Sequence, residues 1–474
     1  MIIITFFTII LGLIVRNYNL AKVLFYDWDE GMYAQIAKEI IKNKSLFTTF
    51  NGQVWLDKPP LVHGLISLIF SIFGYSEFWT RMIMVITSAI LLILLYFLAK
   101  KITKSSMASL LSVVTLATSP IFLERTTLLN SDIFIAVSWL GYFLFWDKYW
   151  AKLFFLTLGV WSKSVLGFYP LLIEIFYELW QLIFHQKKLH LNLKLISKYL
   201  LMITLPSLWY IVGYFKFGQF FIANHFLSQV LKRLYVPIEL HFGGKFFYFN
   251  YLWEKMGIIN LLFVIGYILF GFNILKKIPK YKIKLFDLIL FSPLPFLTLL
   301  TIMRTKITWY VIIFLPLLCL LIAYLYMKLN QKILKYGLII FITGYFFLNF
   351  IPQTFLLKVN YSPPEKLKLA QCLSKTKYKK IAFLVDEEER KVKNFLEAAH
   401  YDTTSSFLYG GSPSFVYYIN KKVDYFYSID SFINETNKYQ LLVSSKKDKD
   451  MSLQKLEKNS IKICDSENWI SIIK

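Results

Sequence analysis

The sequence predicts a polytopic α-helical membrane protein with a small soluble α/β domain after its last membrane span. Of the 474 residues, 57% are hydrophobic, whereas soluble domains usually contain about 45–50% apolar residues. The excess lies in uncharged runs that approach the roughly 20 apolar residues needed to cross a bilayer as a helix. Because backbone polar groups in lipid must bond within their own segment, these runs are predicted to be helices. Examples are residues 83–98, 261–275, 311–326 and 338–350.

Lysine clusters orient the predicted spans. The net charge of +24 would also fit a nucleic-acid-binding protein, but the lysines lie mostly in short loops between apolar runs. This is the positive-inside bias of membrane proteins, so the clusters mark the cytoplasmic side and no nucleic-acid partner is expected. The clusters contain Lys100, Lys101 and Lys104; Lys187, Lys188, Lys194 and Lys198; Lys276, Lys277, Lys280, Lys282 and Lys284; and Lys328, Lys332 and Lys335.

A set of about eleven spans satisfies these clusters, and the boundaries allow between about 10 and 13. The apolar N-terminus has no basic segment and no small-residue cleavage site before Arg16. We therefore expect it to stay attached as a first span in the plasma (inner) membrane, with its N-terminus in the cytoplasm. The spans are expected near 2–24, 78–99, 105–123, 132–147, 151–163, 165–184, 199–215, 255–275, 285–303, 308–327 and 336–355.

This topology leaves four segments on the outer face: 25–77, 124–131, 216–254 and the tail after the last span. Within the first outer loop, residues 32–41 have the apolar spacing of an amphipathic helix that lies on the membrane surface. The outer face therefore receives most of the acidic and histidine residues that could form a site.

The tail is polar and lysine-rich, and it divides the chain into a membrane domain, 1–355, and an extracytoplasmic α/β domain, 356–474. Cys372 and Cys464 both fall in this tail, where a disulfide is an open alternative. No glycine-rich nucleotide-binding pattern occurs there. We predict a helix at 387–399 and strands at 381–385, 423–427, 441–443 and 461–464.

Three carboxylates, Asp27, Asp29 and Glu30, follow the first predicted span. A solvated acidic loop is the simplest interpretation. It does not explain why the carboxylates are interleaved with aromatic residues at the lipid boundary, where a shifted pKa can suit a carboxylate to act as a base. The neighbouring aromatic residues are Tyr26, Trp28 and Tyr33.

Two further acidic positions lie on the predicted outer side. Asp57 and Lys58 precede Pro59 and Pro60, which stiffen the chain and stop a helix; the alternative is a simple turn. Asp132 stands at the head of a predicted span, where an ionised group is costly and is often functional. It could equally cap that helix.

Cations at the outer edge run against the positive-inside bias. Lys163 lies between two apolar runs, and Arg304 and Lys306 precede Trp309 and Tyr310. Cations beside aromatic residues suit an anionic ligand such as a phosphate. The alternative is that they reach toward lipid headgroups.

A histidine in the third outer segment raises the question of a metal. His225 together with Asp57 could hold a divalent cation if their loops meet. Apart from this divalent ion, the residues require no cofactor.

Taken in order, these motifs resemble the membrane glycosyltransferases that use polyprenyl-phosphate sugars, in the aminoarabinose transferase and protein O-mannosyltransferase-like superfamily with the C-type glycosyltransferase fold. Three residues depart from the family pattern: Met32 stands where the family often has Arg, Asp57 where the aminoarabinose enzymes commonly have Glu, and Ser164 where Gly is usual. These departures concern the sugar and acceptor more than the reaction. The matching positions are Asp29-Glu30 with Tyr33-Ala34; Asp57-Lys58-Pro59-Pro60-Leu61; Phe73-Gly74 with Glu77 and Arg81; Asp132; Lys163 with Pro170; and Lys306 with Tyr310 and Pro316.

The resemblance implies transfer of a sugar, with inversion, from an undecaprenyl-phosphate-like donor to a hydroxyl on a lipid A or lipopolysaccharide, glycan or protein acceptor. Besides these substrates, membrane lipids are the expected partners; the oligomeric state is not predicted. An attacking hydroxyl needs a base, and a departing phosphate needs fixed cations. The implied catalytic residues are Asp29, Asp132 and Glu30; the donor phosphate is expected at Lys58, Lys163, Arg304, Lys306 and Tyr310; and the substrate at Tyr26, Tyr33 and Asp57.

Three other classes compete with this interpretation. A transporter or flippase would place ionisable groups near the middle of the membrane, often at broken helices. A structural protein with an outer domain would leave the carboxylate and lysine pattern unexplained. A polysaccharide ligase would use a pyrophosphate-linked lipid donor instead.

Overall fold

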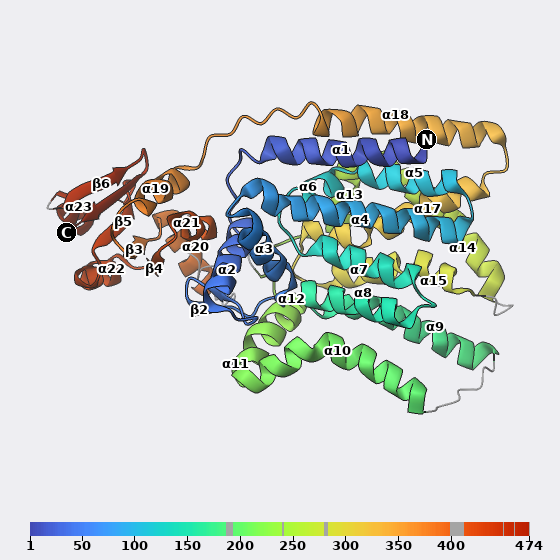
Figure 1. Cartoon of the computed structure of the whole chain (residues 1–474), viewed down its shortest axis with the longest axis horizontal. Helices are drawn as coiled ribbons and strands as arrows, with labels where there is room; N and C mark the ends of the chain where they lie inside the picture. The colour runs from blue at the N-terminus through green and yellow to red at the C-terminus, as the bar shows by residue number, and fades with distance from the viewer. Residues whose placement is uncertain are drawn as a thin grey trace.

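The computed structural model of the chain describes residues 1–185, 193–238, 241–278, 283–398, 412–448, 450–458 and 460–473. Long helices run side by side through most of the molecule, and a small mixed sheet with its own helices lies beyond one end of them (Figure 1). The lysines Lys187, Lys188, Lys280 and Lys282 of the predicted cytoplasmic clusters lie outside the described residues.

Within the described ranges, eight helical segments are long and apolar enough to cross a membrane. The predicted spans near 105–123, 132–147 and 151–163 coincide instead with shorter helices: α5 (Ser106–Ala117) followed by α6 (Pro120–Arg125), α7 (Asp132–Leu144) and α8 (Tyr149–Ser162). The prediction of a polytopic helical membrane protein is confirmed, while the number of crossings stays a prediction. The eight segments are α1 (Ile2–Leu20), α4 (Glu77–Thr103), η1 (Val165–Phe168) with α9 (Tyr169–His185), α10 (Leu193–Phe217), α14 (Ile259–Lys277), α15 (Leu285–Phe291) with α16 (Pro293–Ile302), η4 (Thr308–Tyr310) with α17 (Val311–Lys328), and α18 (Lys332–Thr354).

Local sequence signals fix where several helices begin. Ser76, Ser105 and Ser119 precede α4, α5 and α6, and each side chain accepts a backbone N–H from the first turn of its helix. Helix α17 is apolar around its circumference and packs against α4, α5, α7 and α14, so it is buried at the centre of the bundle.

The two ends of the bundle differ in character. The end of α1, the start of α4, and helices α6 and α12 (Lys232–Tyr235) lie at the end that faces the sheet (Figure 1). The lysine-bearing C-terminal ends of α4 and α14 lie at the opposite end. The predicted outer segments are therefore gathered at one end of the molecule.

The first outer loop folds into a compact unit at that end. Helix α2 (Asp29–Asn43) contains the predicted surface helix and packs against α3 (Leu61–Phe73). Between them, β1 (Thr49–Phe50) and β2 (Gln53–Val54) form a hairpin whose turn residues Asn51 and Gly52 have φ of 53° and 78°. Positive φ at both positions is the signature of the tight turn that Asn-Gly favours.

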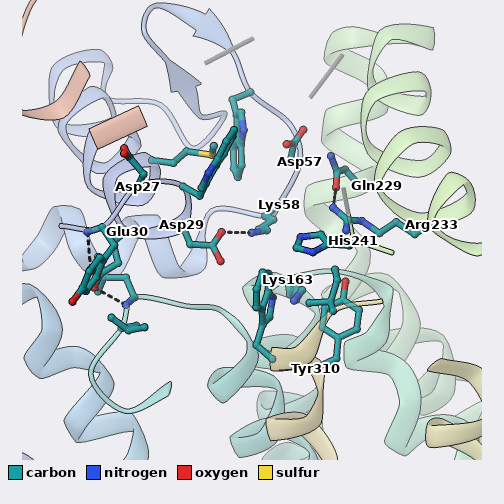
Figure 2. Close-up of a pocket in the computed structure, with 18 of the residues that line it drawn as sticks. Asp27, Asp29, Glu30, Asp57, Lys58, Lys163, Gln229, Arg233, His241 and Tyr310 are labelled. Atoms are coloured by element: carbon teal, nitrogen blue, oxygen red, sulfur yellow. Dashed lines mark hydrogen bonds and ion pairs between the residues drawn. The ribbon is translucent and has the colours of Figure 1, made fainter. Parts of the chain in front are cut away.

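The loop between α10 and α14 also carries helical structure. It contains α11 (Gln219–Phe221), the π-helix η2 (Ile222–Leu231), α12 and α13 (Phe247–Met256). This segment forms the wall of the bundle end opposite the first outer loop (Figure 2).

The C-terminal α/β domain is built on a sheet with strand order β4-β3-β5-β7-β6. β3 runs parallel to β4 and β5, and β7 runs antiparallel to β5 and β6. The predicted strands and the predicted helix are all present, whereas β7 was not predicted. The elements are α19 (Glu365–Ser374), β3 (Lys380–Leu384), α20 (Glu387–Ala398), α21 (Pro413–Ile419), β4 (Lys422–Phe426), α22 (Ile429–Glu435), η5 (Thr436–Lys438), β5 (Leu441–Ser445), α23 (Met451–Lys458), β6 (Ile461–Asp465) and β7 (Trp469–Ile473).

A disulfide joins the two ends of this domain. Cys372 in α19 is bonded to Cys464 in β6, with their Cα atoms 6.2 Å apart, which is an ordinary separation for a disulfide. The alternative left open by the sequence is thereby resolved in favour of the bond.

Candidate active site

A cavity of about 680 Å³ opens at the end of the bundle that faces the sheet. Its walls come from the first outer loop, the turns that precede α7 and follow α8, the segment between α11 and α13, the η4 turn before α17 and helix α20 of the C-terminal domain. Figure 2 shows ten of the lining residues by name. Three of the predicted outer segments and the C-terminal domain therefore meet around one cavity. The lining combines aromatic and apolar side chains with both carboxylates and cations.

Asp29 faces into this cavity from the first residue of α2 (Figure 2). Lys58 Nζ lies 3.2 Å from Asp29 Oδ1 and donates a second hydrogen bond of 2.6 Å to the hydroxyl of Tyr33. The segment that ends in Pro59 and Pro60 thus places Lys58 against the Asp29 carboxylate. Tyr33 is fully buried beneath the pair and does not line the cavity itself.

The surrounding charges keep Asp29 ionised. Burial acts to raise the pKa of this carboxyl, but the positive charges of Lys58, Lys163 and Arg125 outweigh it, so that the pKa of Asp29 lies below its usual value. Burial likewise acts to lower the pKa of Lys58, and the negative charge of Asp29 outweighs it, which raises the pKa of Lys58 well above its usual value. The pair is therefore a carboxylate and an ammonium over the whole physiological pH range.

A second ion pair lies behind the cavity. Lys163, at the end of α8, lines the cavity and pairs with Asp132, which is 1% exposed. The Lys163 ammonium also lies 4.2 Å from the centre of the Tyr310 ring. Asp132 does not itself line the cavity, so it acts on a ligand only through Lys163.

The alternative role of Asp132 as a helix cap is not what the structure shows. The side-chain oxygen of Asn130 accepts the N–H of Ile133 in the first turn of α7, and Asp132 turns toward Lys163 instead. The cap is therefore provided two residues before Asp132.

Two cavity cations were not predicted as site residues. Arg125, at the end of α6, pairs with Glu124 and lies over the Trp309 ring at 5.3 Å. Arg233 in α12 is 8% exposed and donates a 2.6 Å hydrogen bond to Gln229. Both lie in predicted outer segments, so the departure from the positive-inside bias that identified Lys163 could have found them.

Glu30 contributes to the cavity wall but is committed to a structural network. It is 3% exposed, and Arg81 of α4 donates to its two carboxylate oxygens at 2.9 and 2.7 Å. The backbone N–H groups of Tyr26 and Leu129 donate to the same carboxylate. Arg81 also donates to backbone carbonyls at the end of α1 and just after it, those of Leu20 and Val23. This network therefore links α2 to α4 and to the end of α1.

Asp27 and Tyr26 lie at the edge of the cavity. The Asp27 carboxylate accepts hydrogen bonds from Ser412 and Ser414 of the C-terminal domain. Tyr26, which is 47% exposed, lines the cavity. Asp57 also lines it (Figure 2).

Lys306 and Arg304 do not line the cavity. The Lys306 ammonium donates to the backbone carbonyls of Leu300, Thr301 and Met303, at 3.0 Å for the first and 2.7 Å for the second. It therefore satisfies the last carbonyls of α16, which is a common role for a cation after a helix. Arg304 is exposed outside the cavity, and this geometry does not support the prediction that the two residues bind a phosphate.

The structure also gives no support to the predicted metal pair. His225 is fully buried among the rings of Trp209, Tyr210 and Phe221, and its Nδ1 lies 2.8 Å from the carbonyl oxygen of Leu56. It does not line the cavity that Asp57 lines. In the described part of the chain, no group of three or more His, Cys, Asp or Glu residues could hold a metal ion.

The C-terminal domain completes the cavity. Glu388, Glu389 and Val392 of α20 form part of its wall, and Glu389 pairs with Lys366 at 3.2 Å. The cavity cations, Lys58, Arg125, Lys163 and Arg233, all come from the membrane domain. The arrangement can hold an anionic group on the bundle side while a carboxylate, Asp29, accepts a proton.

Known proteins match parts of this sequence. Residues 57–210 match the family described as dolichyl-phosphate-mannose-protein mannosyltransferase. Two uncharacterized proteins of Aquifex aeolicus are 29% and 26% identical over 234 and 304 residues, which cover 47% and 61% of this chain. The matched segments span 46% and 64% of the length of those relatives.

Solved structures share the fold over almost the whole chain. ArnT from Cupriavidus metallidurans bound to undecaprenyl phosphate has a TM-score of 0.68 at 12% identity, covering 99% of this chain and 97% of that one. The oligosaccharyltransferase of Archaeoglobus fulgidus has a TM-score of 0.53 at 11% identity, covering 93% and 69%. The resemblance predicted from the motifs is thus confirmed at the level of the fold.

Proposed function

We propose that this chain, which has the fold of C-type membrane glycosyltransferases, transfers a sugar from a polyprenyl-phosphate donor to a hydroxyl acceptor at the outer face of the plasma (inner) membrane, with inversion at the anomeric carbon. The observation that carries the proposal is the meeting of Asp29 with the cavity cations at one end of the bundle. The solved structure of ArnT holds undecaprenyl phosphate, and a ligand of that kind suits a cavity that has both cations and apolar walls.

Asp29 is the proposed base. The acceptor hydroxyl gives its proton to the Asp29 carboxylate as its oxygen forms a bond to the anomeric carbon. The bond between that carbon and the phosphate oxygen breaks on the opposite face, and the electron pair leaves with the polyprenyl phosphate. The low pKa of Asp29 means that no proton has to be lost before the reaction begins.

Lys58 and Lys163 are the proposed groups for the leaving phosphate, supported by Arg125 and Arg233. Charge grows on the phosphate as the bond breaks, and preorganised cations stabilise that charge most strongly in the transition state. Tyr310 and Asp132 hold Lys163 in place. In this proposal Glu30 has a structural role, and Tyr26 and Asp57 contact the substrate from the cavity walls.

The test is sugar transfer by the purified chain in lipid nanodiscs from radiolabelled polyprenyl-phosphate sugars. We expect Asp29→Asn to lower transfer by about 10²- to 10⁴-fold, the usual contribution of a general base. Asp147→Asn is the matched control, because Asp147 also pairs with a lysine, Lys101, but lies in the loop between α7 and α8 at the other end of the bundle. Full activity of the Asp29 variant would exclude the assigned base.

Donor chemistry separates the competing functions. A pyrophosphate-linked donor consumed in place of every phosphate-linked one would indicate a polysaccharide ligase. Absence of transfer from all donors, with movement of one across the bilayer, would indicate a transporter or flippase. The sugar and the class of acceptor follow from which labelled donor is consumed and which product carries the label.

A further inference from the structure

The C-terminal domain contacts the chain on both sides of Asp29, at Asp27 and at Gly31. Helix α21 packs directly against α2, and Ser414 lies so close to Gly31 that a Cβ at Gly31 would come within 2.6 Å of the Ser414 backbone. The close packing of α2 and α21 therefore requires a glycine at position 31, because the Cβ of any other residue would push the two helices apart. The contact joins the domain to the turn that carries Asp29.

Asp27 makes the polar part of this contact. Its carboxylate accepts the backbone N–H of Ser414 at 3.1 Å, the Ser414 hydroxyl, and the Ser412 hydroxyl at 3.1 and 3.3 Å. Ser412 and Ser414 are buried. Because the Ser414 N–H belongs to the first turn of α21, it has no acceptor within its own helix, and Asp27 supplies one from the membrane domain.

A second set of bonds holds the chain just before Asp27. The N–H of Phe25 donates to the Tyr418 hydroxyl at 2.6 Å, and that hydroxyl donates to Glu77 at 2.7 Å. The Lys38 ammonium donates to the Tyr417 carbonyl at 2.8 Å. Both ends of α21 are thus bonded to the first outer loop.

The residue between Asp27 and the proposed base, Asp29, has an unusual backbone conformation. Trp28 has φ of 66° and ψ of −117°. A non-glycine residue in such a conformation costs on the order of 1–3 kcal/mol and persists only where its surroundings enforce it. Here the surroundings are Asp27 on one side, tied to Ser412 and Ser414, and Glu30 on the other, tied to Arg81.

We propose that the C-terminal domain is a positioning element of the active site, and that Asp27 is a positioning residue that holds the Trp28 turn so that Asp29 faces the cavity. The proposal rests on the proposed function, in which Asp29 is the base. It gives the domain a role in catalysis besides lining the cavity, and it separates the neighbouring carboxylates into one that positions and one that reacts.

The test compares Asp27→Asn with Asp450→Asn in the full-length protein in nanodiscs. Asp450 is a matched control because it also accepts the N–H groups of a first helical turn, from Ser452 and Leu453 of α23, but it does so inside the C-terminal domain. We expect Asp27→Asn to lower kcat by about 10- to 100-fold, as a misplaced catalytic group does. The KM for the donor should stay within about twofold, since the cavity cations are untouched. The control should keep wild-type kcat.

Two further measurements separate positioning from a general loss of folding. In Ser414→Ala and in the double variant Asp27→Asn/Ser414→Ala, we expect the effects on kcat to be non-additive, because both changes break one contact. Amide exchange by mass spectrometry should rise over residues 25–32 and 412–419 in Asp27→Asn and stay at the wild-type level elsewhere.

Equal kcat for Asp27→Asn and Asp450→Asn would overturn the proposal. So would unchanged exchange over residues 25–32. If the wild-type protein transfers no sugar at all, the proposed function fails instead. The exchange measurement then still decides whether Asp27 holds the turn, so the two failures can be told apart.

Discussion

Breaking the pair between Lys163 and Asp132 should separate stability from catalysis. Lys163→Met leaves Asp132 in place, with a side chain 2% exposed and its only ion-pair partner among the described residues removed. An uncompensated buried charge costs roughly 3–5 kcal/mol. That cost should appear as a fall of several degrees in the thermal midpoint of the purified protein. Sugar transfer should also fall, because the cavity loses one of the cations that the mechanism uses.

The double variant Lys163→Met/Asp132→Leu removes both charges. Replacing a buried ion pair by apolar residues of similar size is often neutral for stability, so the free energy of unfolding should return to within about 1 kcal/mol of the wild-type value. The thermal midpoint should rise again with it. Transfer should stay low. The assay is differential scanning fluorimetry beside donor consumption. A double variant that regains transfer together with stability would refute the assignment of Lys163 to the departing phosphate, since it would show that the pair only supports the fold.

Three other outcomes follow from the structure. The pKa of Asp29 lies below its ordinary value of 3.8, so this base stays ionised at every pH above that value. The pH profile of kcat/KM should therefore show no acid limb between about pH 5 and 8. An acid limb near pH 6 that disappears in Asp29→Asn would contradict the low pKa. Glu30→Gln breaks the bidentate contact with buried Arg81 and should cost roughly 3–5 kcal/mol of stability; a variant with wild-type thermal midpoint and reduced kcat would argue for a catalytic Glu30 instead. Lys306→Met should leave the donor KM within about twofold and lower the thermal midpoint slightly, because this lysine satisfies carbonyls of α16; a large rise in donor KM would restore it as a phosphate ligand.

The sequence predicted the architecture well because lipid imposes strong rules. Uncharged runs identified the helices, and the lysine clusters separated one end of the bundle from the other. The strands of the C-terminal domain were found by their apolar runs. Strand β7, Trp469–Ile473, was missed although the turn-forming residues Asp465, Ser466 and Asn468 stand before its short apolar run.

The sequence led to residues that the structure brings to one cavity, but not to what each of them contacts. Asp29, Lys58 and Lys163 all line that cavity, and their roles in the reaction stay predictions. A cation near an aromatic residue on the predicted outer face has the same sequence pattern whether it binds a phosphate or the backbone carbonyls at a helix end. Lys306 binds the carbonyls at the end of α16. His225 could not be distinguished from a ligand because its aromatic surroundings come from side chains of other helices.

The contact between Asp27 and Ser414 spans 387 positions of the chain. The first outer loop leaves the ribosome before most of the membrane helices, and the segment that fixes its geometry is made after them. Loop closure over so long a separation comes late in folding. The cavity therefore stays unfinished while the intervening helices insert, and a chain that stops before α21 has every proposed reacting group but no fixed arrangement of them.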